Sequence, residues 1–135
     1  METNILYGKA VAESVKDGLE ARITACKKEG VQPGLVVVLV GEDPASQSYV
    51  RSKGRACEAL GIYSETILLP AETSQDELNA LVDRLNVDDR FHGILVQLPL
   101  PKHLNDVEII ERISPDKDVD GFHPMNVGRL VQGQE

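Results

Sequence analysis

Leu-Val-Val-Val-Leu-Val-Gly-Glu-Asp-Pro, at residues 35–44, is the stretch that decides the fold. Its first six residues are apolar and mostly β-branched, which is typical of a short strand buried on both faces of a sheet. Asp43 and Pro44 then form a helix start, because the aspartate can cap backbone N–H groups and proline has no N–H to leave unpaired. We therefore predict a strand over 35–40 that leads directly into a helix over 44–60.

Strands and helices alternate along the rest of the chain. Apolar residues spaced mostly four apart predict an amphipathic helix over 9–29, with a stripe made of Val11, Val15, Leu19, Ile23 and Cys26. Four further elements follow: a strand over 62–69, a helix from the Ser74–Glu77 capping box to about 86, a strand around 93–96, and a short helix from Asn105 to about 113. This alternation predicts an α/β fold, a three-layer sandwich whose mainly parallel sheet is built from β-α-β units.

The two ends of the chain carry weaker patterns. Residues 1–7 are short and apolar, and we expect an edge strand or a packed arm there. Residues 128–135 show neither a strand pattern nor a helix stop, so we predict no element for them. We expect one domain over 1–135, and the abrupt end indicates a piece of a longer protein.

Composition excludes several classes of protein. The chain has 135 residues and a net charge of −8, which argues against a nucleic-acid partner, because such proteins need a basic face. No apolar run approaches the roughly 20 residues that span a bilayer, and no signal peptide is visible, so we expect no membrane partner and a cytoplasmic location. Cys26 and Cys57 lie in separate predicted helices without metal-ligand spacing, and we predict that both are reduced and buried.

Tyr49 and Lys53 are the first candidates for chemistry. They lie four residues apart, on one face of a helix that follows the carboxyl end of a buried strand, where open α/β sheets place their ligands. A partly buried lysine is suited to moving protons, and a tyrosine ring to stacking. The plainer interpretation is a surface lysine beside a half-buried tyrosine.

Two further polar stretches follow later elements. Gln97 is the first polar residue after the third predicted strand, in a loop stiffened by two prolines, and it is either a partner for a lysine amine or a turn residue. In the acidic stretch 115–124, Asp118 and Asp120 are candidates to accept hydrogen bonds from a heterocycle. A calcium loop is disfavoured there, because Val127 stands where the twelfth-position glutamate belongs, and we predict no metal site.

The Tyr-x-x-x-Lys spacing also occurs in short-chain dehydrogenases. Those enzymes need a glycine-rich turn after the first strand to hold the dinucleotide. Here Glu42 and Asp43 occupy that turn, and their charge would repel a pyrophosphate. We reject this interpretation and predict no cofactor-binding residues in the chain.

Three segments together resemble the bifunctional methylenetetrahydrofolate dehydrogenase/methenyltetrahydrofolate cyclohydrolase family. They are Val40-Gly-Glu-Asp-Pro-Ala-Ser46 with Tyr49-Val-Arg-Ser-Lys53, Gly93-Ile-Leu-Val-Gln-Leu-Pro-Leu-Pro101, and Pro115-Asp-Lys-Asp-Val-Asp-Gly121. The resemblance covers the family's N-terminal catalytic, folate-binding domain. It implies that an NADP-binding Rossmann domain lies outside this chain and that the complete enzyme is a homodimer.

The resemblance also assigns residues. It makes Lys53 the proton-transfer residue, Gln97 its orienting partner and Tyr49 the ring that stacks on the folate. It makes Asp120 the carboxylate that binds the pterin, and it places Leu98 and Pro99 along the slot.

The implied activity is oxidation of 5,10-methylenetetrahydrofolate with NADP, followed by hydrolysis of the methenyl product to 10-formyltetrahydrofolate. We expect this chain alone to be inactive as a dehydrogenase. Two alternatives stay open: a stand-alone domain that binds folate without turnover, and the substrate half of another two-domain dehydrogenase.

Overall fold

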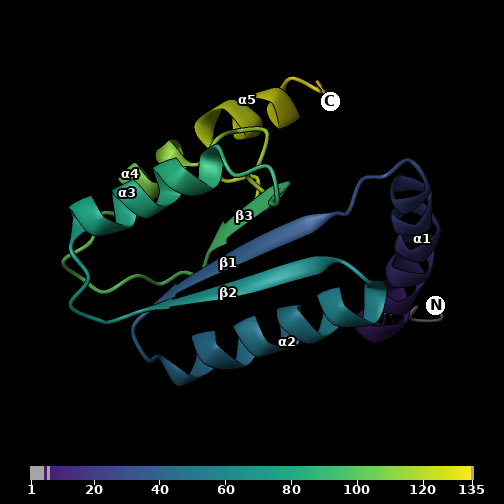
Figure 1. Ribbon diagram of the computed structural model, residues 1–135, viewed down its shortest axis with the longest axis horizontal. Helices are drawn as coiled ribbons and strands as arrows, with labels where there is room; N and C mark the ends of the chain where they lie inside the picture. The colour runs from purple at the N-terminus through teal and green to yellow at the C-terminus, as the bar shows by residue number, and fades with distance from the viewer. Residues whose placement is uncertain (1–4, 6, 135) are drawn as a thin grey trace.

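The structure is a computed structural model that describes residue 5 and residues 7–134. Helices and strands alternate through most of the chain (Figure 1). In chain order the elements are α1 (Gly8–Lys28), β1 (Gly34–Val40), α2 (Pro44–Leu60), β2 (Tyr63–Leu69), α3 (Gln75–Asn86), β3 (Gly93–Val96), α4 (Asp106–Arg112) and α5 (Pro124–Val131).

The three strands form one parallel sheet in the order β2-β1-β3. β1 is the central strand, and five consecutive residues, 36–40, are at most 4% exposed. The prediction of a strand buried on both faces is therefore confirmed. Parallel strands place their carboxyl ends at one edge of the sheet, so α2 and the loop after β3 begin side by side.

Alternate residues of β1 contact different helix layers. Val36, Val38 and Val40 belong to an apolar cluster with residues of α3 and α4, whereas Val37 and Leu39 pack with residues on the opposite face. That second cluster contains Val50 of α2, and Figure 1 shows α2 on one side of the sheet with α3 and α4 on the other. The predicted three-layer α/β architecture with a parallel sheet is confirmed.

Local signals in the sequence set most helix ends. Asp43 Oδ1 accepts a hydrogen bond of 2.7 Å from the Ser46 amide at the start of α2, and Gly61 ends this helix with φ +71°. Ser74 and Glu77 form the expected reciprocal capping box at the start of α3. These boundaries agree with the predicted ones because each rests on contacts within a few residues.

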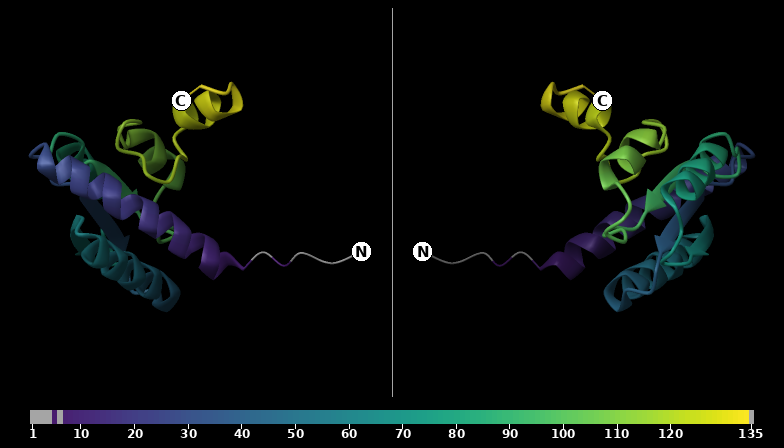
Figure 2. Two further views of the ribbon diagram at one scale, coloured as in Figure 1. Left: turned by 90° about the vertical axis from the view of Figure 1, so that its right-hand side faces the viewer. Right: turned by 90° about the vertical axis from the view of Figure 1, so that its left-hand side faces the viewer.

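Helix α1 forms where predicted, but most of its apolar stripe is not covered. Val11 and Val15 are 56% and 58% exposed, and Ile23 is the one buried side chain of the helix. Cys57 is buried as predicted, whereas Cys26 is only half-buried, which corrects that prediction. The first turns of α1 project beyond the other elements (Figure 2), so nothing among the described residues covers this part of the stripe.

The prediction of no element at the C-terminal end is wrong, because α5 occupies 124–131. His123 Nδ1 accepts a hydrogen bond from the Met125 amide, and Pro124 takes the first helical position. The His-Pro pair and the spacing of Val127, Leu130 and Val131 were the available signals. All three of these apolar side chains are exposed, so α5 buries no side chain.

The edge strand or arm predicted for residues 1–7 falls mostly outside the described residues. Of its two described positions, Ile5 and Tyr7, both are exposed and neither lies in a strand. Within residue 5 and residues 7–134, no helix is both long and apolar enough to cross a membrane.

Candidate active site

Lys53 and Gln97 meet at the carboxyl edge of the sheet. Lys53 lies on α2 and is half-buried, and its Nζ donates a hydrogen bond of 2.9 Å to Oε1 of Gln97. The two residues are 44 positions apart in the chain. The parallel topology brings them together, because α2 follows β1 and Gln97 follows the neighbouring strand β3.

The Gln97 amide is held in one orientation. Its Nε2 donates a hydrogen bond of 2.8 Å to the Leu98 carbonyl, which leaves Oε1 to face the lysine. Its backbone N–H also donates to the Val38 carbonyl at 2.8 Å, so the residue is tied to β1. A neutral amide oxygen therefore directs the Lys53 amine without adding a counter-charge.

Asp120 reaches the same site from the acidic turn, which we define as residues 115–123. Asp118 forms a parallel bridge to Ile94 of β3, so continuing in the same direction brings Asp120 toward the carboxyl end of that strand. Loss of solvent around the Asp120 carboxyl raises its pKa, the positive charge of Lys53 lowers it, and the charge of Asp118 raises it further. Asp120 is thus electrostatically coupled to Lys53, although the two make no direct hydrogen bond.

The two candidate aspartates differ in their surroundings. Asp118 accepts three hydrogen bonds, from the amides of Gly121 and His123 and from the side chain of Asn126. No hydrogen bond from a described residue reaches the Asp120 carboxylate, which is therefore available to a ligand. Residue spacing alone left both as candidates and the family resemblance assigned Asp120, while the hydrogen bonds show how the surroundings of the two carboxylates differ.

The remaining candidates lie around this pair. Tyr49 is one helical turn before Lys53 and 62% exposed, so its ring is accessible. Leu98 is half-buried, Pro99 is exposed, and the peptide bond between them is cis. A small hollow lined by Leu98, Asp120 and Phe122 places two of the candidates together. Sequence reasoning missed Phe122, and its position directly after the acidic motif was the only available signal.

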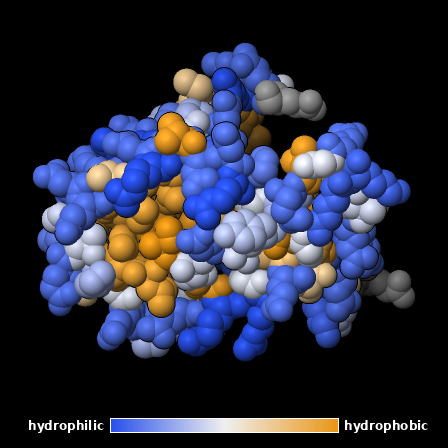
Figure 3. Space-filling model, in the orientation of Figure 1, coloured by the Kyte–Doolittle hydropathy of each residue, from blue (hydrophilic) through white to orange (hydrophobic). Residues whose placement is uncertain are grey.

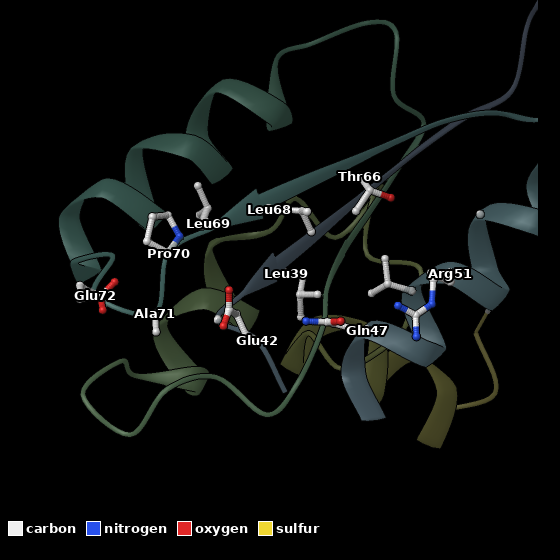
Figure 4. Close-up of a pocket in the computed structure, with 13 residues that line it drawn as sticks. Leu39, Glu42, Gln47, Arg51, Thr66, Leu68, Leu69, Pro70, Ala71 and Glu72 are labelled. Atoms are coloured by element: carbon white, nitrogen blue, oxygen red, sulfur yellow. The ribbon is translucent and has the colours of Figure 1, made fainter. Parts of the chain in front are cut away.

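A cavity of much greater volume lies elsewhere. It has a volume of about 850 Å³ between α2 and β2, with Leu39 and Leu68 on its floor and Arg51 at its rim (Figure 4). Leu68 is 69% exposed, and apolar surface gathers over this end of β2 (Figure 3). None of the predicted site residues lines this cavity, so its volume points to a different face from the one that carries them.

The turn between β1 and α2 does not fit a dinucleotide. A pyrophosphate would need the free N–H groups at the start of α2, but the Asp43 carboxylate already accepts from the Ser46 amide there. Glu42 adds a second negative charge beside this turn. Among the described residues there is also no group of three or more His, Cys, Asp or Glu side chains suited to hold a metal ion.

Comparison with known proteins identifies the family of this chain. Residues 6–120 match the family described as tetrahydrofolate dehydrogenase/cyclohydrolase, catalytic domain. The chain belongs to this family. Bifunctional protein FolD from Bacillus mycoides is 56% identical over 131 residues, which are 97% of this chain and 46% of that relative.

Solved structures of the tetrahydrofolate dehydrogenase/cyclohydrolase family share the fold. The FolD methylenetetrahydrofolate dehydrogenase/cyclohydrolase of Campylobacter jejuni gives a TM-score of 0.92 at 50% identity over 95% of this chain and 45% of that one. The Trypanosoma brucei enzyme, solved with NADP cofactor and an inhibitor, gives a TM-score of 0.92 at 36% identity. The match covers 100% of this chain and 46% of that one. The chain thus spans about half the length of the relatives that it matches.

Proposed function

We propose that this chain is the folate-binding, catalytic half of a bifunctional methylenetetrahydrofolate dehydrogenase/cyclohydrolase. The complete enzyme would oxidise 5,10-methylenetetrahydrofolate with NADP and hydrolyse the 5,10-methenyl product to 10-formyltetrahydrofolate. The observation that carries this proposal is the 2.9 Å hydrogen bond from Lys53 to an amide oxygen of fixed orientation. Membership of the family supports it independently.

Lys53 would transfer protons in the hydrolytic step. With Lys53 as the neutral amine, the oxygen of a water molecule bonds to the methenyl carbon while one water proton passes to the Lys53 amine. The resulting ammonium then gives this proton to N5 as the bond from that carbon to N5 breaks, and the hydroxyl proton is released to solvent as the formyl C=O forms. Gln97 would keep the amine pointed at the reacting carbon, since its own amide cannot rotate without losing the bond to the Leu98 carbonyl. Oxidation of the methylene bridge leaves a stabilised cation, so that half-reaction needs positioning more than a strong base.

The other site residues would hold the folate. The accessible Tyr49 ring would stack on its flat part, and the Asp120 carboxylate would accept hydrogen bonds from adjacent N–H groups of the pterin. Leu98 and Pro99 would line the slot between them. A carboxylate that accepts no hydrogen bond from the described residues, in a hollow that it shares with Leu98, supports this arrangement.

A second domain would bind NADP. The acidic, self-capped start of α2 leaves no dinucleotide site at the first β-α turn of this chain, and the relatives are about twice as long. We therefore assign residues 1–135 to the folate-binding domain and expect no dehydrogenase activity from it alone. The exposed apolar side chains of α1 and α5 support this division, because a second domain would cover them. We further infer that the complete enzyme is a cytoplasmic homodimer.

The domain assignment is tested by reading the coding sequence beyond the codon for Glu135. About 100–150 further residues containing a strand, a glycine-rich turn and a helix would support a two-domain enzyme. A stop codon at that point would favour a stand-alone domain that binds folate without turnover.

The catalytic proposal is tested with Lys53→Met. We expect cyclohydrolase activity to be lost in the enzyme expressed from the complete coding region, because methionine keeps the length of the side chain but cannot carry the proton. Disappearance of the methenyl chromophore is the measurement. Lys16→Met, the same change at an exposed position of α1, is the matched control and should hydrolyse at the wild-type rate. Near wild-type hydrolysis by Lys53→Met would contradict the assignment.

A further inference from the structure

We propose that Asp118 is a positioning residue that holds the acidic turn in the conformation that sets Asp120 beside Leu98 at the carboxyl end of β3. The consequence for folate binding rests on the proposed function, whereas the geometry itself does not. Asp118 accepts three hydrogen bonds, all from residues that follow Asp120 in the chain, and Asp120 accepts none from the described residues. The position of Asp120 therefore depends on bonds made by its neighbour.

The first end of the acidic turn is anchored to β3 and α3. The Ile94 amide donates to the Lys117 carbonyl at 2.8 Å, and the Lys117 side chain donates to the carbonyls of Leu85 and Asp88 at 3.2 and 2.9 Å. Gly93 makes this approach feasible. A Cβ at Gly93 would lie 2.5 Å from a methyl group of Val119.

The second end is closed by the Asp118 carboxylate. Its Oδ1 accepts from the Gly121 amide at 3.1 Å, and its Oδ2 accepts from the His123 amide at 2.9 Å and from Asn126 Nδ2 at 3.0 Å. Gly121 has φ +68°, a left-handed conformation that reverses the chain directly after Asp120. Asn126 also donates to the Pro115 carbonyl at 2.8 Å, which ties α5 to the start of the turn.

These hydrogen bonds also affect the pKa values of the two carboxyl groups. Burial on its own would raise the pKa of Asp118, but the hydrogen bonds from Asn126, His123 and Gly121 outweigh it and lower the pKa. Two charged groups act on Asp120: Lys53 from α2 and Asp118 from the turn itself. Without the closing bonds, the Asp120 carboxyl would be free to leave the carboxyl end of β3 and become more fully hydrated.

Three variants of the chain test the proposal. Asp118→Asn leaves an acceptor for the Gly121 amide but turns an NH2 group toward the two donors that now bond to Oδ2. Asn126→Ala removes one of those donors and leaves both carboxylate charges unchanged. Asp116→Asn is the matched control, since Asp116 lies in the same turn, is exposed and makes no side-chain hydrogen bond with a described residue.

Hydrogen exchange and carboxyl titration by NMR are the deciding measurements, since neither needs a ligand. In Asp118→Asn and Asn126→Ala we expect faster exchange of the Gly121 and His123 amides and a lower pKa for Asp120, whose carboxyl becomes more hydrated. Loss of the Asp118 charge would by itself lower the Asp120 pKa in Asp118→Asn. It cannot do so in Asn126→Ala, because that variant keeps the charge. Wild-type values in Asn126→Ala together with unchanged exchange in Asp118→Asn would overturn the proposal.

A second measurement separates this inference from the proposed function. In the complete enzyme, Asp118→Asn should raise KM for the methenyl folate about tenfold and change kcat little, as expected for loss of a hydrogen bond to a charged group. Asp116→Asn should leave both constants unchanged. A substitution that only destabilised the turn would lower the melting temperature without raising KM selectively over kcat. Failure of the wild-type enzyme to hydrolyse the folate would refute the proposed function, while the NMR result would still decide the role of Asp118.

Discussion

Helices α1 and α3 follow the same apolar rule in the sequence but differ in what covers them. In α3, Leu78, Leu81, Val82 and Leu85 are all buried against the sheet and α4. In α1, only Ile23 is buried, and Val15 is 58% exposed. Apolar periodicity therefore predicts that a helix forms and which side is apolar, but not whether a partner lies within the same chain.

The two helices also differ in how they begin. Ser74 and Glu77 satisfy the first backbone N–H groups of α3 reciprocally, and two acidic residues lie in its first turn. At the start of α1, Tyr7 makes no side-chain hydrogen bond, and no acidic residue lies in the first turn. α3 is thus specified by both local and tertiary contacts, whereas much of α1 depends on its own backbone.

The largest expected difference between the helices comes from one substitution made in each. Val82→Ala removes two methyl groups from a fully buried site of α3 and should cost about 2 kcal/mol or more in the free energy of unfolding. Val15→Ala makes the same change on α1 and should alter it by less than about 0.5 kcal/mol. Urea denaturation of both variants measures this. Equal losses would show that the α1 stripe is covered in solution.

Removing the N-terminal cap of α3 should have a smaller effect on the free energy of unfolding. Ser74→Ala removes the side-chain acceptor for the Glu77 amide, and we expect a loss of about 1 kcal/mol in the free energy of unfolding. Urea denaturation is again the measurement. Tyr7→Ser, which offers α1 the cap that it lacks, is the complementary variant and should stabilise the chain. An unchanged stability of Ser74→Ala would mean that packing alone fixes the start of α3.

The smallest effect is a dependence on pH. A hydrogen bond from the Ser74 amide lowers the pKa of Glu77 from its ordinary value of 4.5, so its contribution to stability is present above that value and is lost as pH falls through the lower one. Glu77→Gln should therefore reduce the loss of stability between neutral and acidic pH. Thermal melts over this range measure it, with Glu13→Gln on the exposed face of α1 as the control. An identical pH profile for Glu77→Gln and wild type would contradict this linkage.

Much of the candidate site could be predicted because Gln97 directly follows β3 and Lys53 lies on the helix that follows β1. Lys53 and Gln97 each follow a strand that the sequence marks clearly, and parallel strands bring such positions to one edge. Phe122, the exposure of the α1 stripe and the hydrogen bonds that distinguish Asp118 from Asp120 could not be predicted. Each depends on contacts with segments that are distant in the sequence. One of these segments is α5, which the sequence pattern did not predict because the helix is short and its apolar side chains are exposed.

The sequence by itself determined the order of the elements, most helix ends and the residues that identify the family. Those features depend on hydrogen bonds and periodicity within a few residues. Only the tertiary structure decided that the Lys53 amine meets a fixed Gln97 oxygen and that Asp118 closes the turn that presents Asp120. The reason is physical: these contacts form only after the sheet aligns α2, β3 and the acidic turn, and the donors that distinguish two similar aspartates are set by that alignment.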